Sequence, residues 1–243
     1  MIVFLDTSEA LDICAAELGL DRGCVKQLVT PLTAFNRQKP HDEFAIDNGA
    51  FAGFRKESFL RLLERENEAR HLCKFVSVPD VVGSAIRTHE IFNYWKYKLP
   101  GWPLAYVAQN GQERQPIPWK HIQALFIGGK DKNDGQGDWK LSVHAVECIR
   151  AAQALGKWVH VGRVNTPGRF EYFENLGVDS IDGTGLSRYT WMREAIWKQM
   201  QQPNLLTGLV PDVELFFPRL DSELSTAETV PETTAVLGSG SGE

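Results

Sequence analysis

Short runs of apolar and β-branched residues recur along the chain, and a polar or helix-forming stretch follows each of them. Several of the runs are apolar on both faces, which is typical of parallel strands covered by helices. We predict eight strands, at residues 2–5, 27–32, 44–47, 75–79, 104–108, 124–128, 158–162 and 178–182.

Four stretches between these runs are predicted helices: 56–72, 82–95, 139–156 and 166–177. The last two end at a glycine, as helix C-termini often do. Alternating strands and helices over this length favour a (β/α)₈ TIM barrel over an open doubly wound sheet. The connection between the first two strands is the least clear part of the pattern. We expect one barrel domain over residues 1–220.

The end of the chain has a different composition. Residues 221–243 are rich in Ser, Thr, Gly and Glu, with little to bury, and predict a disordered acidic tail. This tail contains five acidic residues and no Lys or Arg, whereas the whole chain has a net charge of −5. Residues 1–220 are therefore neutral, and charge alone neither indicates nor excludes a polyanionic partner.

Composition excludes several other classes of protein. No apolar run reaches the roughly 18 residues of a membrane span, and the N-terminus becomes acidic too early for a signal peptide. We therefore expect a cytoplasmic protein with no membrane partner. The four cysteines lack C-x-x-C spacing, and no Cys or His follows His160, so we expect reduced thiols and no metal site.

Several of the predicted strands end in polar residues. In a TIM barrel, the active site lies at this end of the strands. Taken singly, each has a structural interpretation: Asp80 can cap a helix beginning at Val81, and the others can form turns, as Asp182-Gly183 commonly does. Together they place three carboxylates, one amide and a glycine pair on one rim. These residues are Asp47, Asp80, Gln109, Gly128, Gly129 and Asp182.

This set suits a planar base such as guanine. Asp80 can accept from ring and exocyclic N–H groups, Gln109 can bond the carbonyl, and Gly129 lets backbone N–H groups come close. Asp47 and Asp182 then remain for double displacement at a glycosidic carbon, one as nucleophile and one for proton transfer. The aromatic candidates for stacking on the base are Phe51, Phe54, Tyr106 and Trp139.

Five segments, in order between about residues 40 and 190, resemble the tRNA-guanine transglycosylase superfamily of (β/α)₈ barrels. IDNGAF resembles T-D-S-G-G-F/Y, VAQNG resembles V-Q-G-G, and FIGGKD is similar to I-G-G-L. GVDSIDGTGLSRY resembles G-V-D-x-F-D-C-V-x-P-T-R, and Asp80 falls where the base-reading Asp of the family closes its strand.

The resemblance implies that Asp47 is the general acid/base and Asp182 the nucleophile. It also implies that Asn48, Phe51, Asp80, Gln109, Gly128 and Gly129 bind the base, and that no cofactor or metal is needed. Asn48, Ala50 and Gly183 are mild departures from the family residues. The zinc subdomain of the tRNA enzymes is missing, so the chain looks more like the DpdA-like branch of phage and bacterial enzymes, which insert 7-deazaguanines into DNA.

The partners expected from this resemblance are DNA with a flipped-out guanine and a free 7-deazaguanine base, the 7-cyano compound or a relative. A short neutral barrel can also need an unidentified helper protein to open the duplex. Candidate phosphate contacts are Lys130, Lys132, Lys140, Arg163, Arg169 and Arg188, for each of which solvated surface charge is the competing interpretation.

Three alternatives stay open at the level of the sequence. The same exchange could act on tRNA, with this chain as one subunit of a heterodimer. The barrel could instead bind nucleic acid or a base without chemistry. It could also be an unrelated barrel enzyme, such as a lyase or a small-molecule glycosidase.

Overall fold

Eight parallel strands close into a barrel in the computed structural model, which describes residues 1–32, 37–130 and 138–201. Strand β1 pairs with both β2 and β8, so the ring has no free edge. The strands are β1 (Ile2–Leu5), β2 (Val25–Val29), β3 (Phe44–Ile46), β4 (Cys73–Ser77), β5 (Leu104–Ala108), β6 (Ala124–Ile127), β7 (Trp158–Val161) and β8 (Ser180–Asp182).

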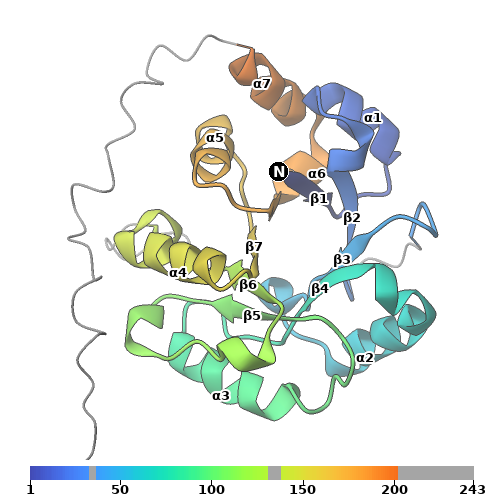
Figure 1. Ribbon diagram of the computed structural model, residues 1–243. Helices are drawn as coiled ribbons and strands as arrows, with labels where there is room; N and C mark the ends of the chain where they lie inside the picture. The colour runs from blue at the N-terminus through green and yellow to red at the C-terminus, as the bar shows by residue number, and fades with distance from the viewer. Residues whose placement is uncertain (33–36, 131–137, 202–243) are drawn as a thin grey trace, which may run out of the picture. The chain divides into compact units, whose positions relative to one another are not determined.

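Helices surround these strands (Figure 1). Within the described residues, the β2–β3 and β5–β6 connections contain no α-helix, and two 3₁₀ turns, Gln112–Arg114 and Trp119–His121, occupy the second. The predicted (β/α)₈ fold is confirmed. The α-helices are α1 (Leu11–Leu18), α2 (Lys56–Arg65), α3 (Ala85–Trp95), α4 (Val143–Ala154), α5 (Pro167–Asn175), α6 (Thr184–Arg188) and α7 (Thr190–Met200).

Several predicted bounds differ from those in the structure. The helix predicted over 56–72 is α2 followed by a 3₁₀ helix at Asn67–Leu72. The one predicted from 139 begins as α4 at Val143, because the Ser142 hydroxyl caps the Ala145 N–H. Helices α6 and α7 follow β8 and were not predicted, since the two glycines after Asp182 look like a turn.

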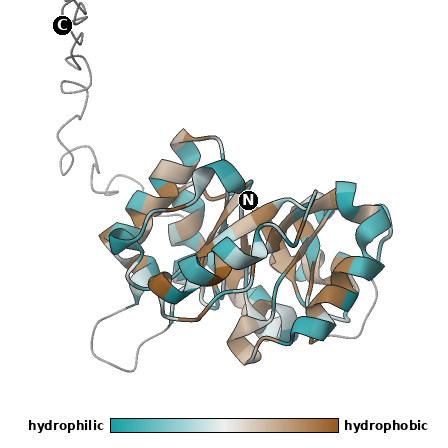
Figure 2. Ribbon diagram, turned by 90° about the horizontal axis from the view of Figure 1, so that it is seen from below, coloured by the Kyte–Doolittle hydropathy of each residue, from teal (hydrophilic) through white to brown (hydrophobic). Residues whose placement is uncertain are grey.

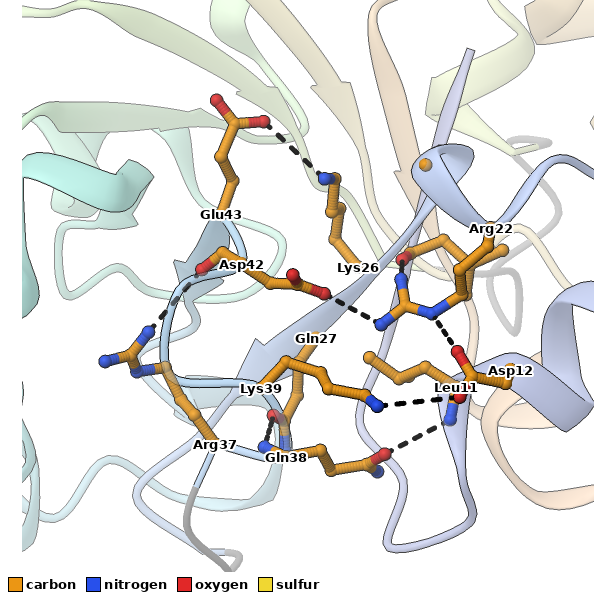
Figure 3. Close-up of polar contacts among 12 residues, drawn as sticks. Leu11, Asp12, Arg22, Lys26, Gln27, Arg37, Gln38, Lys39, Asp42 and Glu43 are labelled. Atoms are coloured by element: carbon orange, nitrogen blue, oxygen red, sulfur yellow. Dashed lines mark hydrogen bonds and ion pairs between the residues drawn. The ribbon is translucent and has the colours of Figure 1, made fainter.

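The connections before β2 and β3 are held by polar contacts (Figure 3). Arg22 binds Asp12 of α1 at 2.6 Å and Asp42 at 2.7 Å. The Gln38 backbone N–H donates to Oε1 of Gln27 on β2 at 2.8 Å, and Gln38 Oε1 accepts from the Leu11 N–H at 3.1 Å. This network joins the first helix to the second and third strands, in the region where the sequence pattern is least clear.

Two apolar layers form the core, one between strands and helices and one inside the barrel. Several of the strands in the middle of Figure 2 are coloured brown, as hydrophobic residues. The inner layer includes Phe4, Phe75 and Phe126. His160 lies among these three rings, with centroid separations of 5.9, 4.7 and 4.5 Å. The barrel interior is therefore apolar apart from a few polar side chains.

None of the helices in the described part of the chain has the length and apolar character needed to cross a membrane. The predicted tail over 221–243, and the predicted domain boundary at residue 220, lie outside the described residues.

Candidate active site

A cavity of about 160 Å³ lies at the C-terminal ends of the strands. One water needs roughly 10–15 Å³ of such space, so this cavity has room for a small organic molecule. Eleven of the predicted residues line it: Asp47, Asn48, Phe51, Asp80, Gln109, Gly128, Gly129, Lys140, Arg163, Asp182 and Arg188.

Asp80 lies between two amide side chains that are themselves fixed. Asn48 Nδ2 donates to Asp80 Oδ1 at 2.9 Å, and Gln109 Nε2 donates to Asp80 Oδ2 at 2.6 Å. Asn48 Oδ1 accepts from the Ala50 N–H at 2.6 Å, which determines which end of that amide faces Asp80. Asp80 is therefore held as an acceptor, with lone pairs remaining on both oxygens.

Gln109 is oriented by backbone donors. Its Oε1 accepts from the N–H groups of Gly83 at 2.8 Å and Gly129 at 2.9 Å, so its Nε2 must face Asp80. The Gly129 N–H, predicted to approach a base, is thus already bonded to Gln109. Contact with a base carbonyl then falls to the second Nε2 hydrogen of Gln109.

Burial raises the pKa of Asp80 to about 6, with the charge of Asp47 adding to the rise and the bonds from Asn48 and Gln109 opposing it. Asp80 is therefore ionised at neutral pH and protonated in mild acid. An ionised Asp80 is the form that can accept from N–H donors of a ligand.

Asp47 follows β3, and each of its two carboxylate oxygens accepts a hydrogen bond. The Ser77 hydroxyl donates to Asp47 Oδ1 at 2.9 Å, and the Gly49 N–H donates to Oδ2 at 3.1 Å. Burial, followed by the charge of Asp182, raises the pKa of Asp47 above its ordinary value. Such a carboxyl is suited to holding a proton and releasing it during a reaction.

Asp182 ends β8 and accepts on both oxygens. His160 Nε2 lies 2.9 Å from Asp182 Oδ2, and the Arg163 backbone N–H donates to Oδ1 at 3.0 Å. Arg163 adopts a left-handed backbone conformation, with φ of 58°, at the point where its N–H meets this carboxylate. The side chain of Asp182 retains 13% exposure, toward the cavity that it lines.

Two of the structural interpretations are wrong. Asp80 is not a helix cap, because α3 begins at Ala85 and its N-cap is Ser84. Asp182-Gly183 is not a turn, because β8 passes directly into α6 with Gly183 as the extended N-cap. Gln109 does begin a turn, since the Gln112 N–H donates to the Gln109 carbonyl at 3.0 Å, and the neighbouring Gly49 and Gly111 have positive φ.

Only one of the predicted stacking aromatics lines the cavity. Phe51 is 66% exposed at its mouth, and the Arg163 guanidinium lies 4.1 Å from its ring centroid. Phe54 packs on Phe59 and Trp95, Tyr106 points outward onto Phe92, and Trp139 is buried with its N–H near Glu113. These last three belong to the packing around the barrel.

The predicted cations separate into three groups. Arg163 and Arg188 lie at the cavity, and Lys130 is exposed on the loop after β6. Lys140 is buried and donates to the Gly162 carbonyl at 2.9 Å, and Arg169 forms an ion pair with Asp138, so both have structural partners. Lys132 lies outside the described residues.

Sequence reasoning missed three polar residues inside the barrel: Ser77, His160 and Ser180. The sequence did contain a signal for two of them. His160 lies two residues before Gly162, the last residue of its predicted strand, and Ser180 lies two residues before Asp182. The period of two along a strand therefore places each on the inward face. Their apolar neighbours made them look like ordinary core positions.

The part of the chain that the structure describes contains no group of three or more His, Cys, Asp or Glu residues arranged to hold a metal ion.

Comparison with known proteins does not identify a family for this chain. No family model matches the chain, and no curated protein matches its sequence. Among solved structures, it is similar to phosphoribosyl anthranilate isomerase from Thermus thermophilus, at 14% identity and a TM-score of 0.41. The match covers 82% of this chain and 98% of that one. We draw neither a substrate nor a reaction from a likeness of this size.

Proposed function

We propose that this chain is a base-exchange transglycosylase that replaces guanine in DNA with a 7-deazaguanine through a covalent glycosyl intermediate on Asp182. The observation that carries the proposal is that Asp47 and Asp182 line one cavity but have different surroundings. Burial and the charge of Asp182 raise the pKa of Asp47, whereas Asp182 accepts on both oxygens. Such a difference is what separates an acid from a nucleophile in enzymes with two carboxylates.

In the first step, an Asp182 oxygen forms a bond to C1′ as the C1′–N9 bond of guanine breaks, and N9 takes the proton held by Asp47. Asp182 becomes a neutral ester in this step. Its charge no longer raises the pKa of Asp47, so Asp47 releases its proton as the base departs.

In the second step, the deazaguanine occupies the same cavity and gives its N9 proton to Asp47. Its N9 then attacks C1′ and breaks the ester bond, which restores the Asp182 carboxylate. Two displacements at one carbon give net retention of configuration. The returning charge of Asp182 raises the pKa of Asp47 again, which keeps the proton received from N9 on Asp47.

The base is recognised by its hydrogen-bonding edge. Asp80 accepts from the ring N–H and the exocyclic amine, and Gln109 offers its remaining Nε2 hydrogen to the carbonyl. Phe51, Arg163 and Arg188 at the mouth meet the flanking nucleotides by stacking and phosphate contact. DNA is favoured over tRNA because residues 161–243 contain no Cys or His and so do not supply the zinc ligands that follow the nucleophile in the tRNA enzymes of the resembled superfamily.

The test is incorporation of labelled 7-cyano-7-deazaguanine into double-stranded DNA, single-stranded DNA or tRNA. We expect incorporation into DNA by the wild type, and a loss of several orders of magnitude in Asp182→Ala with base binding largely kept. Incorporation into tRNA alone would overturn the choice of DNA. Base binding with no incorporation into any nucleic acid, and no effect of Asp182→Ala, would favour a non-catalytic barrel.

A further inference from the structure

A continuous hydrogen-bonded column runs through the barrel interior to Asp182. Trp158 Nε1 donates to Ser180 Oγ at 2.8 Å, and Ser180 Oγ lies 2.9 Å from His160 Nδ1. His160 Nε2 then reaches Asp182 Oδ2 at 2.9 Å. These residues alternate along β7 and β8, and His160 is the register partner of Ser180, so the column follows directly from strand pairing.

The two ends of this column fix the direction of its bonds. An indole N–H can only donate, so Ser180 Oγ accepts from Trp158. A carboxylate oxygen can only accept, so the His160 nitrogen that faces Asp182, Nε2, carries a hydrogen. In the neutral imidazole, Nδ1 is then the unprotonated nitrogen, and it accepts the hydroxyl hydrogen of Ser180.

We infer that His160 is a positioning residue for Asp182, and that Trp158 and Ser180 select its neutral Nε2–H tautomer. The catalytic importance of this positioning role rests on the proposed function. The tautomer of His160, in contrast, is a property of the protein alone. A neutral donor orients a carboxylate without pairing it with a full positive charge, so Asp182 stays nucleophilic. His160 is fully buried among Phe4, Phe75 and Phe126, which restricts the orientation of its ring.

His160 and the backbone of Arg163 approach Asp182 from within the protein, one on each oxygen. The carboxylate is thereby fixed in two directions, and its remaining lone pairs face the cavity. As C1′ bonds to one oxygen, the donor on the other stabilises the ester carbonyl. The same donor stabilises the carboxylate when the ester bond breaks.

The first test is NMR of the ¹⁵N-histidine-labelled protein, with the His160 signal assigned by its loss in His160→Gln; the chain has six histidines. We expect the Nε2–H tautomer in the wild type. Trp158→Phe keeps a ring but removes the donor to Ser180 Oγ, so the Ser180 hydroxyl is no longer held toward Nδ1 and we expect a fraction of the Nδ1–H tautomer to appear. A wild-type Nδ1–H tautomer, or no change in Trp158→Phe, overturns the inference whether or not the protein exchanges bases.

The second test compares single-turnover base release with guanine affinity. His160→Gln can still donate to Asp182, whereas His160→Phe fills the space without a donor. We expect base release within about tenfold of wild type for His160→Gln, and a loss on the order of 10²-fold for His160→Phe, with the guanine Kd unchanged in both. Equal rates in wild type and His160→Phe would overturn the positioning role while leaving the exchange reaction intact. If His160→Phe does not fold, His160→Gln and the tautomer measurement still decide.

Discussion

At the residue scale, the base-reading carboxylate depends on amides whose orientation is set elsewhere. Asn48 and Gln109 turn their N–H groups toward Asp80 because their oxygens already accept from backbone N–H groups. In Asp80→Asn, the new amide N–H group would face the N–H group of Asn48 or of Gln109, and neither of the two could accept a hydrogen bond. The identity of Asp80 is therefore dictated by its neighbours as well as by any ligand.

Guanine binding should depend on pH through Asp80. Its pKa is raised to about 6, and the ionised form accepts from the base, so the Kd should rise about tenfold per pH unit below 6 and level off above it. Titration of the protein with guanine between pH 5 and 8 measures this. Asp47→Asn should keep the dependence with its midpoint at lower pH, because the charge of Asp47 raises the pKa of Asp80, and Asp80→Asn should lose the dependence. A wild-type Kd that stays constant down to pH 5 would contradict the role of Asp80.

The sequence allowed much of this site to be predicted, since Asp47, Asp80, Gln109 and Asp182 each follow a recognisable strand and do line one cavity. It did not show that the Gly129 N–H is used by Gln109, or that Asp182 rests on His160. Those bonds join residues at least 20 positions apart in the sequence. Which group donates and which accepts can be assigned only when the neighbouring donors and acceptors are known in three dimensions.

At the element scale, the junction between β8 and α6 determines where Asp182 lies. A Cβ on Gly183 would come within 2.5 Å of the Val164 carbonyl oxygen and 2.8 Å of Asn165 Oδ1. Gly183 thus permits close packing of the loop after β7 against the junction of β8 and α6.

Gly183→Ala should therefore destabilise the protein by about 1–3 kcal/mol, because the two loops must separate. The matched control is Gly168→Ala in α5, where a Cβ has no heavy atom within 4 Å. We expect that change to be neutral or stabilising by up to about 1 kcal/mol. Urea unfolding of both variants checks this, and equal midpoints would show that the junction tolerates a side chain.

At the scale of the whole molecule, the ring of helices is closed where α7 meets α1. Arg193 of α7 is fully buried, forms ion pairs with Glu9 and with Glu17 of α1, and donates to the Leu186 carbonyl at 2.7 Å. The alternating pattern predicted the barrel but not this closure, because the partners are about 180 residues apart and α7 itself was not expected.

Arg193→Ala should cost about 3–5 kcal/mol, because it removes a buried charge from partners that stay behind. Arg22→Ala, which breaks the more exposed pairs with Asp12 and Asp42, should cost about 0–1 kcal/mol. The free energies of unfolding of the two variants provide the comparison. A loss for Arg193→Ala no larger than that for Arg22→Ala would mean that closure does not depend on this cluster.

The central claim is that Asp182 carries the sugar between the two bases. The most direct measurement is mass spectrometry of the protein after incubation with a guanine-containing DNA oligonucleotide, removal of free guanine and denaturing quench. The account predicts a protein–DNA adduct lacking one guanine, mapped to the peptide containing Asp182 and missing in Asp182→Ala. Deazaguanine incorporation with the adduct on another residue, or with Asp182→Ala fully active, would contradict it.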